Sequence, residues 1–111
     1  MHELRHYVTP NGRRPLPDWI EGLRERQAKA RIKTRLDRLA DGNFGDHHDV
    51  GEGVYELRID WGPGYRVYYA RIGELILLLL CGGDKRTQDK DIKRAKNYFK
   101  DYKARSAQRP R

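Results

Sequence analysis

The sequence predicts an α+β domain, with helices packed on a mainly antiparallel sheet. The main observation is the segment from Val54 to Gly83, which begins with two runs that alternate between apolar and polar residues, as half-buried strands do. A continuous apolar run then lies between Gly73 and Gly82 and predicts a strand that is covered on both faces. On either side of this segment, apolar residues have helical spacing. A chain of 111 residues has room for one domain with one modest core.

The N-terminal part of the chain predicts a strand followed by two helices. Weak alternation over Glu3–Val8 predicts the strand, and the turn-forming residues 9–12 end it. Helical spacing begins at Pro17, and Asp18 suits a helix N-terminus. A second helical pattern ends at Gly42, which suits a left-handed cap. Its apolar face is predicted to hold Ala28, Ile32, Leu36 and Leu39.

Residues 43–53 are rich in Gly and Asp and predict a loop. The adjacent residues His47 and His48 lie there between Asp46 and Asp49. Neighbouring side chains on an extended chain point apart, and the sequence offers no third ligand at a suitable distance, so we do not interpret them as a metal site. The glycines also lack the spacing of nucleotide-binding motifs. The sequence therefore predicts neither a metal nor a cofactor.

The two alternating runs predict a β-hairpin. Residues 62–64, Gly-Pro-Gly, supply the turn, since glycine tolerates positive φ and proline presets its own φ. With these three residues as the loop, the predicted apolar pairs are Trp61 with Tyr65, Ile59 with Val67 and Leu57 with Tyr69. The predicted polar pairs are Asp60 with Arg66 and Arg58 with Tyr68, with Glu56 one step further from the turn.

The polar face of the hairpin has two interpretations. Arg58 and Arg66 on adjacent strands are held at a fixed separation, which suits the binding of an anion. Alternatively, the face is solvated and Asp60 pairs with Arg66, because exposed arginines are common on antiparallel sheets. The hairpin alone does not decide between them.

The apolar run after the hairpin predicts a central strand over Glu74–Leu80. A buried helix is the alternative, but the run is short and bounded by glycines. Cys81 is the single cysteine, so it has no disulfide partner within the chain, and we interpret it as a small core residue.

A C-terminal helix is predicted to begin after Thr87, a natural N-cap. Its apolar positions are Ile92, Ala95, Phe99 and Tyr102. Its exposed face holds Lys90, Lys93, Arg94, Lys96 and Lys100. We expect the domain to span residues 1–102 and residues 103–111 to form a basic, mobile tail.

The formal net charge is +8, with 24 Lys and Arg against 16 Asp and Glu. Such an excess favours binding to nucleic acid or to an acidic partner, although it also keeps a small protein soluble. On the second predicted helix, Arg31, Arg35 and Arg38 share a stripe. This stripe is either a solvated face, a ridge that follows phosphates, or a docking surface for an acidic protein. No apolar stretch resembles a signal peptide or spans a bilayer, so we expect a cytoplasmic protein without membrane contact.

Three runs of the chain carry a family resemblance: ARIKTRLDRLADGNFGD, VGEGVYELRIDWGPGYRVYYAR and LLLLCGGDKRTQDKDIKRAKNYFKDY. Together they resemble the RelE/ParE toxin superfamily, and within it the HigB-like addiction-module killer proteins. The specific feature is the combination of ELR, GPGYRVYY and GGDK followed by a Thr-Gln helix start. The fold implied by the resemblance has two N-terminal helices packed on a curved, mainly antiparallel four-stranded sheet, with a C-terminal helix.

The resemblance implies the toxin of a type II toxin-antitoxin system. Relatives of the RelE branch enter the ribosomal decoding site and cut messenger RNA, whereas those of the ParE branch poison DNA gyrase. The implied partners are a co-encoded antitoxin of the helix-turn-helix type, the ribosome and mRNA, with operator DNA reached only through the antitoxin complex. We expect a ribosome-dependent mRNA endoribonuclease. The alternatives are a gyrase inhibitor and a non-catalytic basic module that acts as co-repressor with its antitoxin.

The resemblance also implies site residues. In the RelE branch, a ribose 2′-hydroxyl attacks the adjacent phosphate, which requires a base, an acid and cations that hold the phosphorane oxygens. Arg66 in GYRVYY matches the family arginine that stabilises phosphate, Arg58 in ELR is the second candidate, and Lys85 or Arg86 matches a basic position after the last strand. The further RNA-binding candidates are Arg31, Arg35, Arg38 and Lys93.

The sequence departs from the RelE pattern at two positions. Glu56 stands where those relatives place a lysine, and the position of their C-terminal tyrosine falls near Ile92. The base and the acid are therefore unassigned, with Glu56, Lys85 and Tyr68 as candidates.

Overall fold

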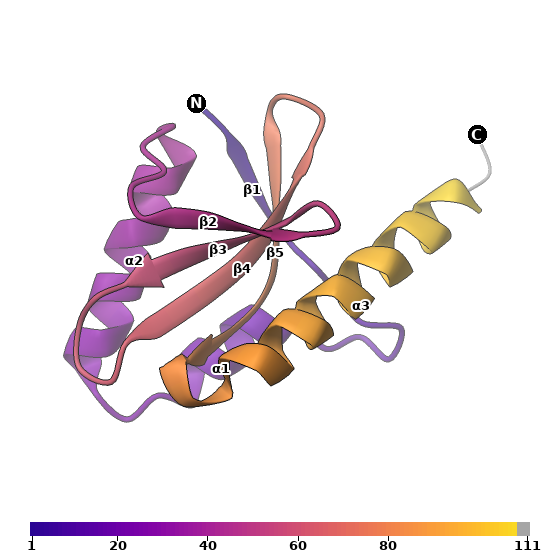
Figure 1. Ribbon diagram of the computed structural model, residues 1–111. Helices are drawn as coiled ribbons and strands as arrows, with labels where there is room; N and C mark the ends of the chain where they lie inside the picture. Colours follow the sequence, from indigo (N-terminus) through magenta and orange to yellow (C-terminus); the bar gives the residue numbers. More distant parts are fainter. Residues whose placement is uncertain (109–111) are drawn as a thin grey trace.

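The computed structural model describes residues 1–108, in which a five-stranded mixed sheet lies between two helical layers (Figure 1). Helices α1 and α2 cover one face of the sheet, and α3 crosses the other. The helices are α1 (Pro15–Glu21), α2 (Arg26–Ala40), the 3₁₀ turn η1 (Lys85–Thr87) and α3 (Gln88–Ala107). The strands are β1 (Glu3–His6), β2 (His47–Gly51), β3 (Val54–Ile59), β4 (Tyr65–Ile72) and β5 (Ile76–Asp84). The predicted α+β class is confirmed.

The sheet has the order β1-β5-β4-β3-β2, and β1 is parallel to β5 while the other pairs are antiparallel. The prediction of four strands was wrong, because the predicted loop contains β2. This strand pairs with β3 through a tight turn in which Glu52 and Gly53 both have positive φ. It lies at the sheet edge and buries little, so its sequence HHDVG lacks the apolar alternation that predicts a strand.

The β3–β4 register differs from the predicted one by two residues. Ile59 pairs with Tyr65 and Arg58 with Arg66, because the connecting loop runs from 60 to 64 and not from 62 to 64. Within the loop, Trp61 donates to the Ile59 carbonyl and Gly64 donates to the Trp61 carbonyl. A shift of two residues keeps every side chain on its predicted face but changes its partner. The predicted pairing of Asp60 with Arg66 is therefore wrong.

Helix boundaries agree with the sequence patterns to within a few residues. Gly42 has φ +89° and follows α2 in a Schellman arrangement, in which Gly42 donates to Leu39 and Asn43 donates to Arg38. Helix α3 continues past Tyr102 to Ala107, beyond the predicted start of the mobile tail. Residues 109–111 of that tail lie outside the described residues.

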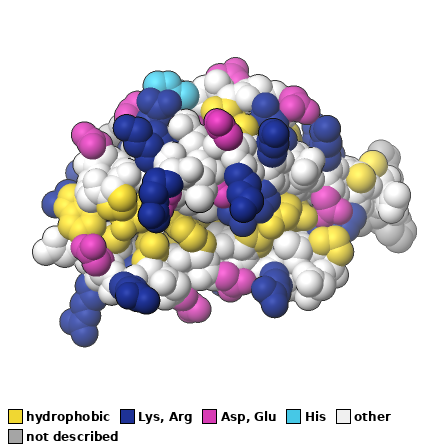
Figure 2. All heavy atoms as spheres, turned by 60° about the horizontal axis from the view of Figure 1, so that its bottom comes forward, with side chains coloured by type: hydrophobic (Ala, Val, Ile, Leu, Met, Phe, Trp, Pro, Cys, Tyr) yellow, Lys and Arg dark blue, Asp and Glu magenta, His cyan; other side chains and the backbone are white. Residues whose placement is uncertain are grey.

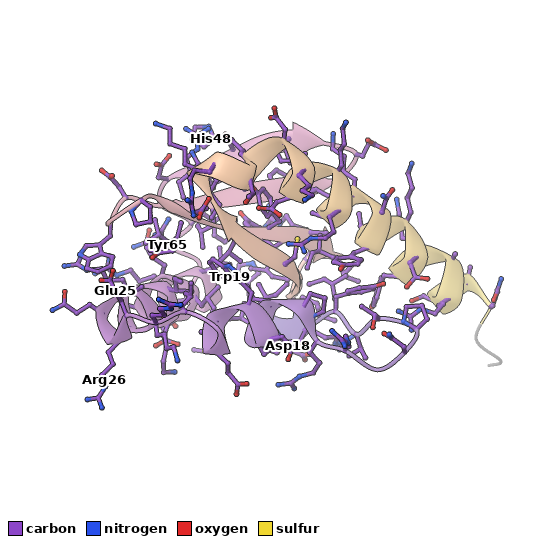
Figure 3. All side chains as sticks on the ribbon, turned by 90° about the horizontal axis from the view of Figure 1, so that it is seen from below. Asp18, Trp19, Glu25, Arg26, His48 and Tyr65 are labelled. Atoms are coloured by element: carbon purple, nitrogen blue, oxygen red, sulfur yellow. The ribbon has the colours of Figure 1, made fainter. Side chains whose placement is uncertain are left out.

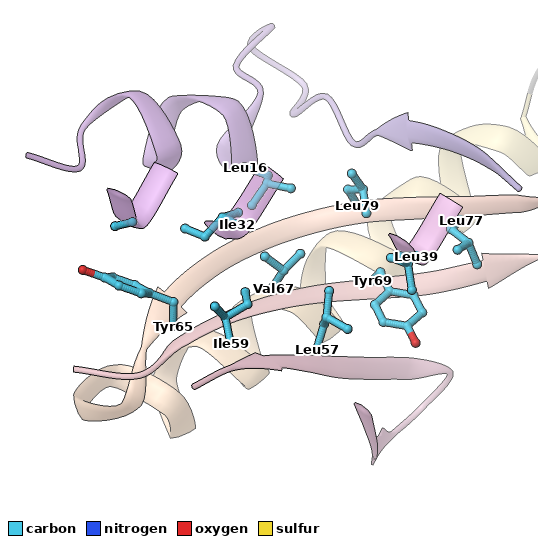
Figure 4. Close-up of a cluster of buried hydrophobic side chains, with 11 residues drawn as sticks. Leu16, Ile32, Leu39, Leu57, Ile59, Tyr65, Val67, Tyr69, Leu77 and Leu79 are labelled. Atoms are coloured by element: carbon cyan, nitrogen blue, oxygen red, sulfur yellow. The ribbon is translucent and has the colours of Figure 1, made fainter. Parts of the chain in front are cut away.

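Two hydrophobic clusters fill the spaces between the layers. The cluster under α1 and α2 joins Leu16, Ile32 and Leu39 to the sheet residues drawn in Figure 4. The cluster under α3 joins Ala95 and Phe99 to Tyr68, Leu78, Leu80 and Cys81. Cys81 is fully buried, as predicted, and burial raises the pKa of its thiol to about 12. None of the helices formed by residues 1–108 has the length and apolar character needed to cross a membrane.

Two glycines of β5 allow the helices to approach the sheet closely. A Cβ atom on Gly82 would overlap the indole ring of Trp19, and one on Gly83 would overlap the carboxylate of Asp91. These contacts bring α1 and α3 against opposite faces of the same strand.

We predict that Gly82→Ala lowers the free energy of unfolding by about 1–3 kcal/mol, because the added methyl group overpacks the α1 side of the core. Urea unfolding measures the change. Gly22→Ala is the control, since Gly22 has φ −73° and its nearest contact to an added Cβ would be 3.5 Å. The control should leave stability unchanged or raise it. Equal effects of the two substitutions would contradict the close packing of Trp19.

Candidate functional site

Glu56 on β3 is the buried charge around which the polar side chains of the α3 face are arranged. Arg58 Nε donates to Oε1 at 2.8 Å, while the Tyr68 hydroxyl and Gln88 Nε2 donate to Oε2 at 3.0 and 2.9 Å. Arg66 Nε lies 3.3 Å from Oε2, an ion-pair distance at which the two groups are not aligned for a hydrogen bond. Side chains of β3, β4 and α3 therefore meet at one carboxylate.

This environment keeps Glu56 charged and Tyr68 neutral. Burial alone would raise the pKa of the Glu56 carboxyl, but hydrogen bonds from Arg58, Gln88 and Tyr68 and the charge of Arg66 outweigh it and lower the pKa. Burial and the adjacent negative charge raise the pKa of Tyr68 far above its usual value. Both side chains are fully buried, so in this structure they orient the arginines and do not reach solvent.

Arg58, Arg66 and Lys85 surround a hollow of about 240 Å³ at the end of the sheet where β3 turns into β4. We call it the Arg66 hollow, and Asp46, Asp60 and Tyr65 also line it. The Arg66 side chain is 9% exposed and that of Arg58 is 38% exposed, so Arg66 is the more deeply seated of the two. The backbone N–H of Lys85 donates to the Gly64 carbonyl at 3.0 Å, which holds η1 against the hairpin loop. Three cations around one space suit the binding of an anion.

The η1 turn directs Arg86 away from this hollow. Asp84 accepts hydrogen bonds from the backbone N–H and the guanidinium of Arg86 at 2.9 and 3.0 Å, and the latter bond does most to lower the pKa of Asp84. In the first turn of α3, Asp91 accepts from Thr87 at 2.5 Å and from Arg94 at 3.0 Å. These carboxylates stabilise the start of α3, which positions Gln88 over Glu56.

An aspartate–histidine pair stands beside Glu56 at the edge of the sheet. His48 pairs with Glu56 across the β2–β3 ladder, so their side chains share the α3 face (Figure 3). Its Nε2 lies 2.9 Å from Oδ1 of Asp46, which lines the Arg66 hollow. His47 faces the opposite side of the sheet and packs edge-on against Phe44.

A larger hollow, of about 460 Å³, lies on the other side of β3 between α2 and the β3–β4 loop. Arg31, Arg35 and Arg38 line it from the helix and Trp61 from the loop, so we call it the Trp61 hollow. The Arg31 guanidinium lies 5.3 Å from the centroid of the Trp61 ring, a cation–π contact. Arg35 donates to two backbone carbonyls at 3.3 and 3.4 Å, and burial lowers its pKa. Arg35 therefore anchors α2, whereas Arg31 and Arg38 are exposed.

The predicted site residues thus separate into distinct groups. The Arg66 hollow brings together Arg58, Arg66 and Lys85, with Glu56 and Tyr68 beneath them. Lys93 lies on the exposed face of α3 and lines neither hollow. The side of the molecule turned forward in Figure 2 carries Lys and Arg side chains on both sides of a strip of hydrophobic ones.

Sequence reasoning missed Gln88 and Asp46 as parts of this site, and His48 as the partner of Asp46. For the last two a signal existed, because residues two apart on a strand point to the same face, but the segment was interpreted as a loop. Gln88 had no such signal, since its contact with Glu56 depends on how α3 crosses the sheet. Within residues 1–108, no group of three or more His, Cys, Asp or Glu side chains is arranged to hold a metal ion.

The chain is 55% identical over 78 residues to an uncharacterized protein of Haemophilus influenzae. The match covers 70% of this chain and 79% of that protein. No protein-family model matches the sequence.

We predict that Glu56→Gln lowers the free energy of unfolding at pH 7 by about 3 kcal/mol, because it leaves buried Arg66 without its counter-charge. The folded-state pKa of Glu56 lies below its unfolded value. Its stabilisation is therefore complete above the ordinary glutamate pKa of about 4.3 and is lost as pH falls through the lowered folded value. Urea unfolding over a pH series should show the difference from wild type shrinking in acid.

The control for this series is Glu52→Gln, which removes an exposed carboxylate that pairs with Lys96 and Lys100 at 3.5 Å. We expect Glu52→Gln to change the free energy of unfolding at pH 7 much less than Glu56→Gln does. If the difference in free energy of unfolding between wild type and Glu56→Gln grows as the pH falls, the direction of the Glu56 pKa shift is contradicted.

Proposed function

The chain belongs to the same family as the uncharacterized Haemophilus influenzae protein. We propose that it is the toxin of a type II toxin-antitoxin system and acts as a ribosome-dependent mRNA endoribonuclease. The observation that carries this proposal is the convergence of Arg58, Arg66 and Lys85 on one hollow. The family resemblance of the ELR, GPGYRVYY and GGDK segments supports it, since these segments supply the three cations.

The proposed arrangement is the RelE/ParE fold with one added edge strand. Without β2, the sheet order is β1-β5-β4-β3, with α1 and α2 on one face and α3 on the other. These are the elements that the resemblance implies. The added strand extends the sheet beside Glu56 and brings Asp46 to the Arg66 hollow.

In the proposed reaction, the 2′-oxygen of a ribose attacks the adjacent phosphorus and the bond to the 5′-oxygen of the next nucleotide breaks. Negative charge increases on the non-bridging oxygens in the transition state, and guanidinium groups that are already oriented stabilise it without reorganisation. Arg66 is the main phosphate ligand because Glu56 and the strand hold it in place, and Arg58 is the second. Lys85 supplies the third charge and has protons to give to the leaving 5′-oxygen.

Glu56 and Tyr68 have positioning roles in this proposal and are neither the base nor the acid. A general base must come within hydrogen-bond distance of the proton that it removes. Both oxygens of Glu56 are occupied by donors, and the side chain is fully buried.

His48 is the proposed general base. Imidazole exchanges protons near neutral pH, and a carboxylate bonded to one ring nitrogen orients the ring. Two contacts support this role: His48 pairs with Asp46, which lines the Arg66 hollow, and it stands beside Glu56 on the ladder. It would take the proton of the 2′-hydroxyl directly or through one water molecule.

The proposed partners are the ribosome with its mRNA, and a co-encoded antitoxin that covers the basic hollows. Operator DNA is reached through the antitoxin complex. Gyrase inhibition and a co-repressor role without catalysis are the other outcomes that the experiments below distinguish.

We predict that Arg66→Ala and Lys85→Ala each reduce ribosome-dependent cleavage of mRNA by about 100-fold or more, because each removes a cation from the transition state. Transcript ends are mapped in a purified translation reaction and in cells that express the protein without its antitoxin. Arg71→Ala is the matched control, since Arg71 is an exposed arginine on the same strand as Arg66. Lys85 is exposed, so its loss tests the charge without disturbing the core.

Two results would overturn the assignment. Growth arrest with intact transcripts and DNA breaks would indicate gyrase as the target. Transcript cleavage that persists in both Arg66→Ala and Lys85→Ala would remove these side chains from the reaction.

We predict that His48→Gln slows cleavage by about 100-fold, since glutamine cannot take the proton of the 2′-hydroxyl. His47→Gln is the control, because the adjacent imidazole faces the other side of the sheet. Single-turnover cleavage rates provide the measurement. An unchanged rate in His48→Gln, or the same loss in both variants, would exclude His48 as the base.

A further inference from the structure

We propose that the Trp61 hollow is a second RNA subsite, in which an unpaired nucleobase stacks on Trp61 next to the phosphate held in the Arg66 hollow. The proposal rests on the proposed function, because it assumes that the bound anion is part of an RNA strand. The proposal specifies that the RNA bound at this position is single-stranded and that its base is unstacked from its neighbours.

The hollow presents a planar ring and a planar cation together. Trp61 lies on the loop that ends the hairpin, and the exposed guanidinium of Arg31 lies over its ring at 5.3 Å from the centroid. Single-stranded RNA is typically bound by bases that stack on aromatic rings or on guanidinium planes. Arg38, also exposed, adds a charge for the phosphate of the same nucleotide.

The loop and its anchors hold the hollow open. Arg35 ties α2 to the backbone carbonyls of Phe44 and Arg58, which sets the distance between the helix and β3. The N–H of Gly64 donates to the Trp61 carbonyl at 3.0 Å, which closes the turn that carries the indole. A rigid platform lowers the entropic cost of binding a flexible strand.

The two hollows meet at the end of β3, where they share part of their lining. Ile59 and Asp60 line both of them. The N–H of Arg58 donates to the Asp46 carbonyl, and the pairing of β3 with β2 does not extend beyond this point, while Asp60 is exposed. A strand whose phosphate lies against Arg66 can therefore pass over Asp60 and place its neighbouring base against Trp61.

The aromatic ring and the acceptor in the wall favour a nucleotide over an acidic peptide at this hollow. Asp60 is a carboxylate within the wall, an acceptor that a base edge can use and that the side chain of a glutamate or an aspartate cannot. The same carboxylate accepts hydrogen bonds from the amino groups of a base edge. An acidic protein segment is thus the competing occupant that the experiment must exclude.

The test is the binding of a labelled single-stranded oligoribonucleotide to the isolated protein, followed by fluorescence anisotropy. We expect Trp61→Ala and Arg31→Ala each to weaken binding by about tenfold, since stacking on one base contributes about that much. Trp61→Phe should retain most of the affinity. Arg26→Ala is the charge-matched control for Arg31→Ala, because Arg26 lies at the start of the same helix, does not line the hollow and points away from the sheet (Figure 3).

Several outcomes separate the possibilities. Unchanged affinity in both Trp61→Ala and Arg31→Ala would overturn the proposal, as would an oligoglutamate peptide that binds in a Trp61-dependent way while the RNA does not. Arg31 is exposed, so its substitution remains informative if Trp61→Ala unfolds. Trp61-dependent RNA binding by a protein that cuts no message on ribosomes would retain the subsite and remove the proposed catalysis. Cleavage of mRNA without Trp61-dependent RNA binding would retain the proposed catalysis and remove the subsite.

Discussion

The buried carboxylate of Glu56 is the interaction on which the rest of this structure depends. A fully buried charge is stable only when donors and counter-charges surround it, and here Arg58, Arg66, Tyr68 and Gln88 do so. These partners come from β3, β4 and the start of α3, so one charge determines how the hairpin and the C-terminal helix meet. The same contacts aim two guanidinium groups at the Arg66 hollow.

The hairpin loop gives the molecule two different surfaces at one end of the sheet. On the α3 side, β3, β4 and the η1 turn hold cations around a small hollow, which suits a compact anion. On the α2 side, Trp61 and the helix arginines border a larger hollow that suits a flat ring. Because most of these side chains stand on strands or on an anchored helix, their separations are set by the sheet and not by mobile loops.

Much of the fold could be predicted, since periodic patterns report which face of an element is buried. Strands β3 and β4, the helices α2 and α3, and the burial of Cys81 followed from such patterns. The edge strand β2 did not, because an edge that buries few side chains needs no alternation. The hairpin register was wrong by two residues, since glycine and proline indicate a turn but do not state how many residues it contains. Arg58 and Arg66 were candidates from the hairpin pattern as well as the family resemblance, and Lys85 from the resemblance alone, but neither source carried information about their burial or partners.

By itself, the sequence determined the fold class, the positions of the main elements and the excess of positive charge. These are local properties, because spacing and composition act within a few turns of chain. Only the tertiary structure decided that Glu56 lies beneath the arginines, that His48 stands beside Glu56, and that the Arg31 guanidinium lies near the Trp61 ring. Those contacts join residues that are brought together by packing and strand register, and no pattern along the chain records the distance between two elements.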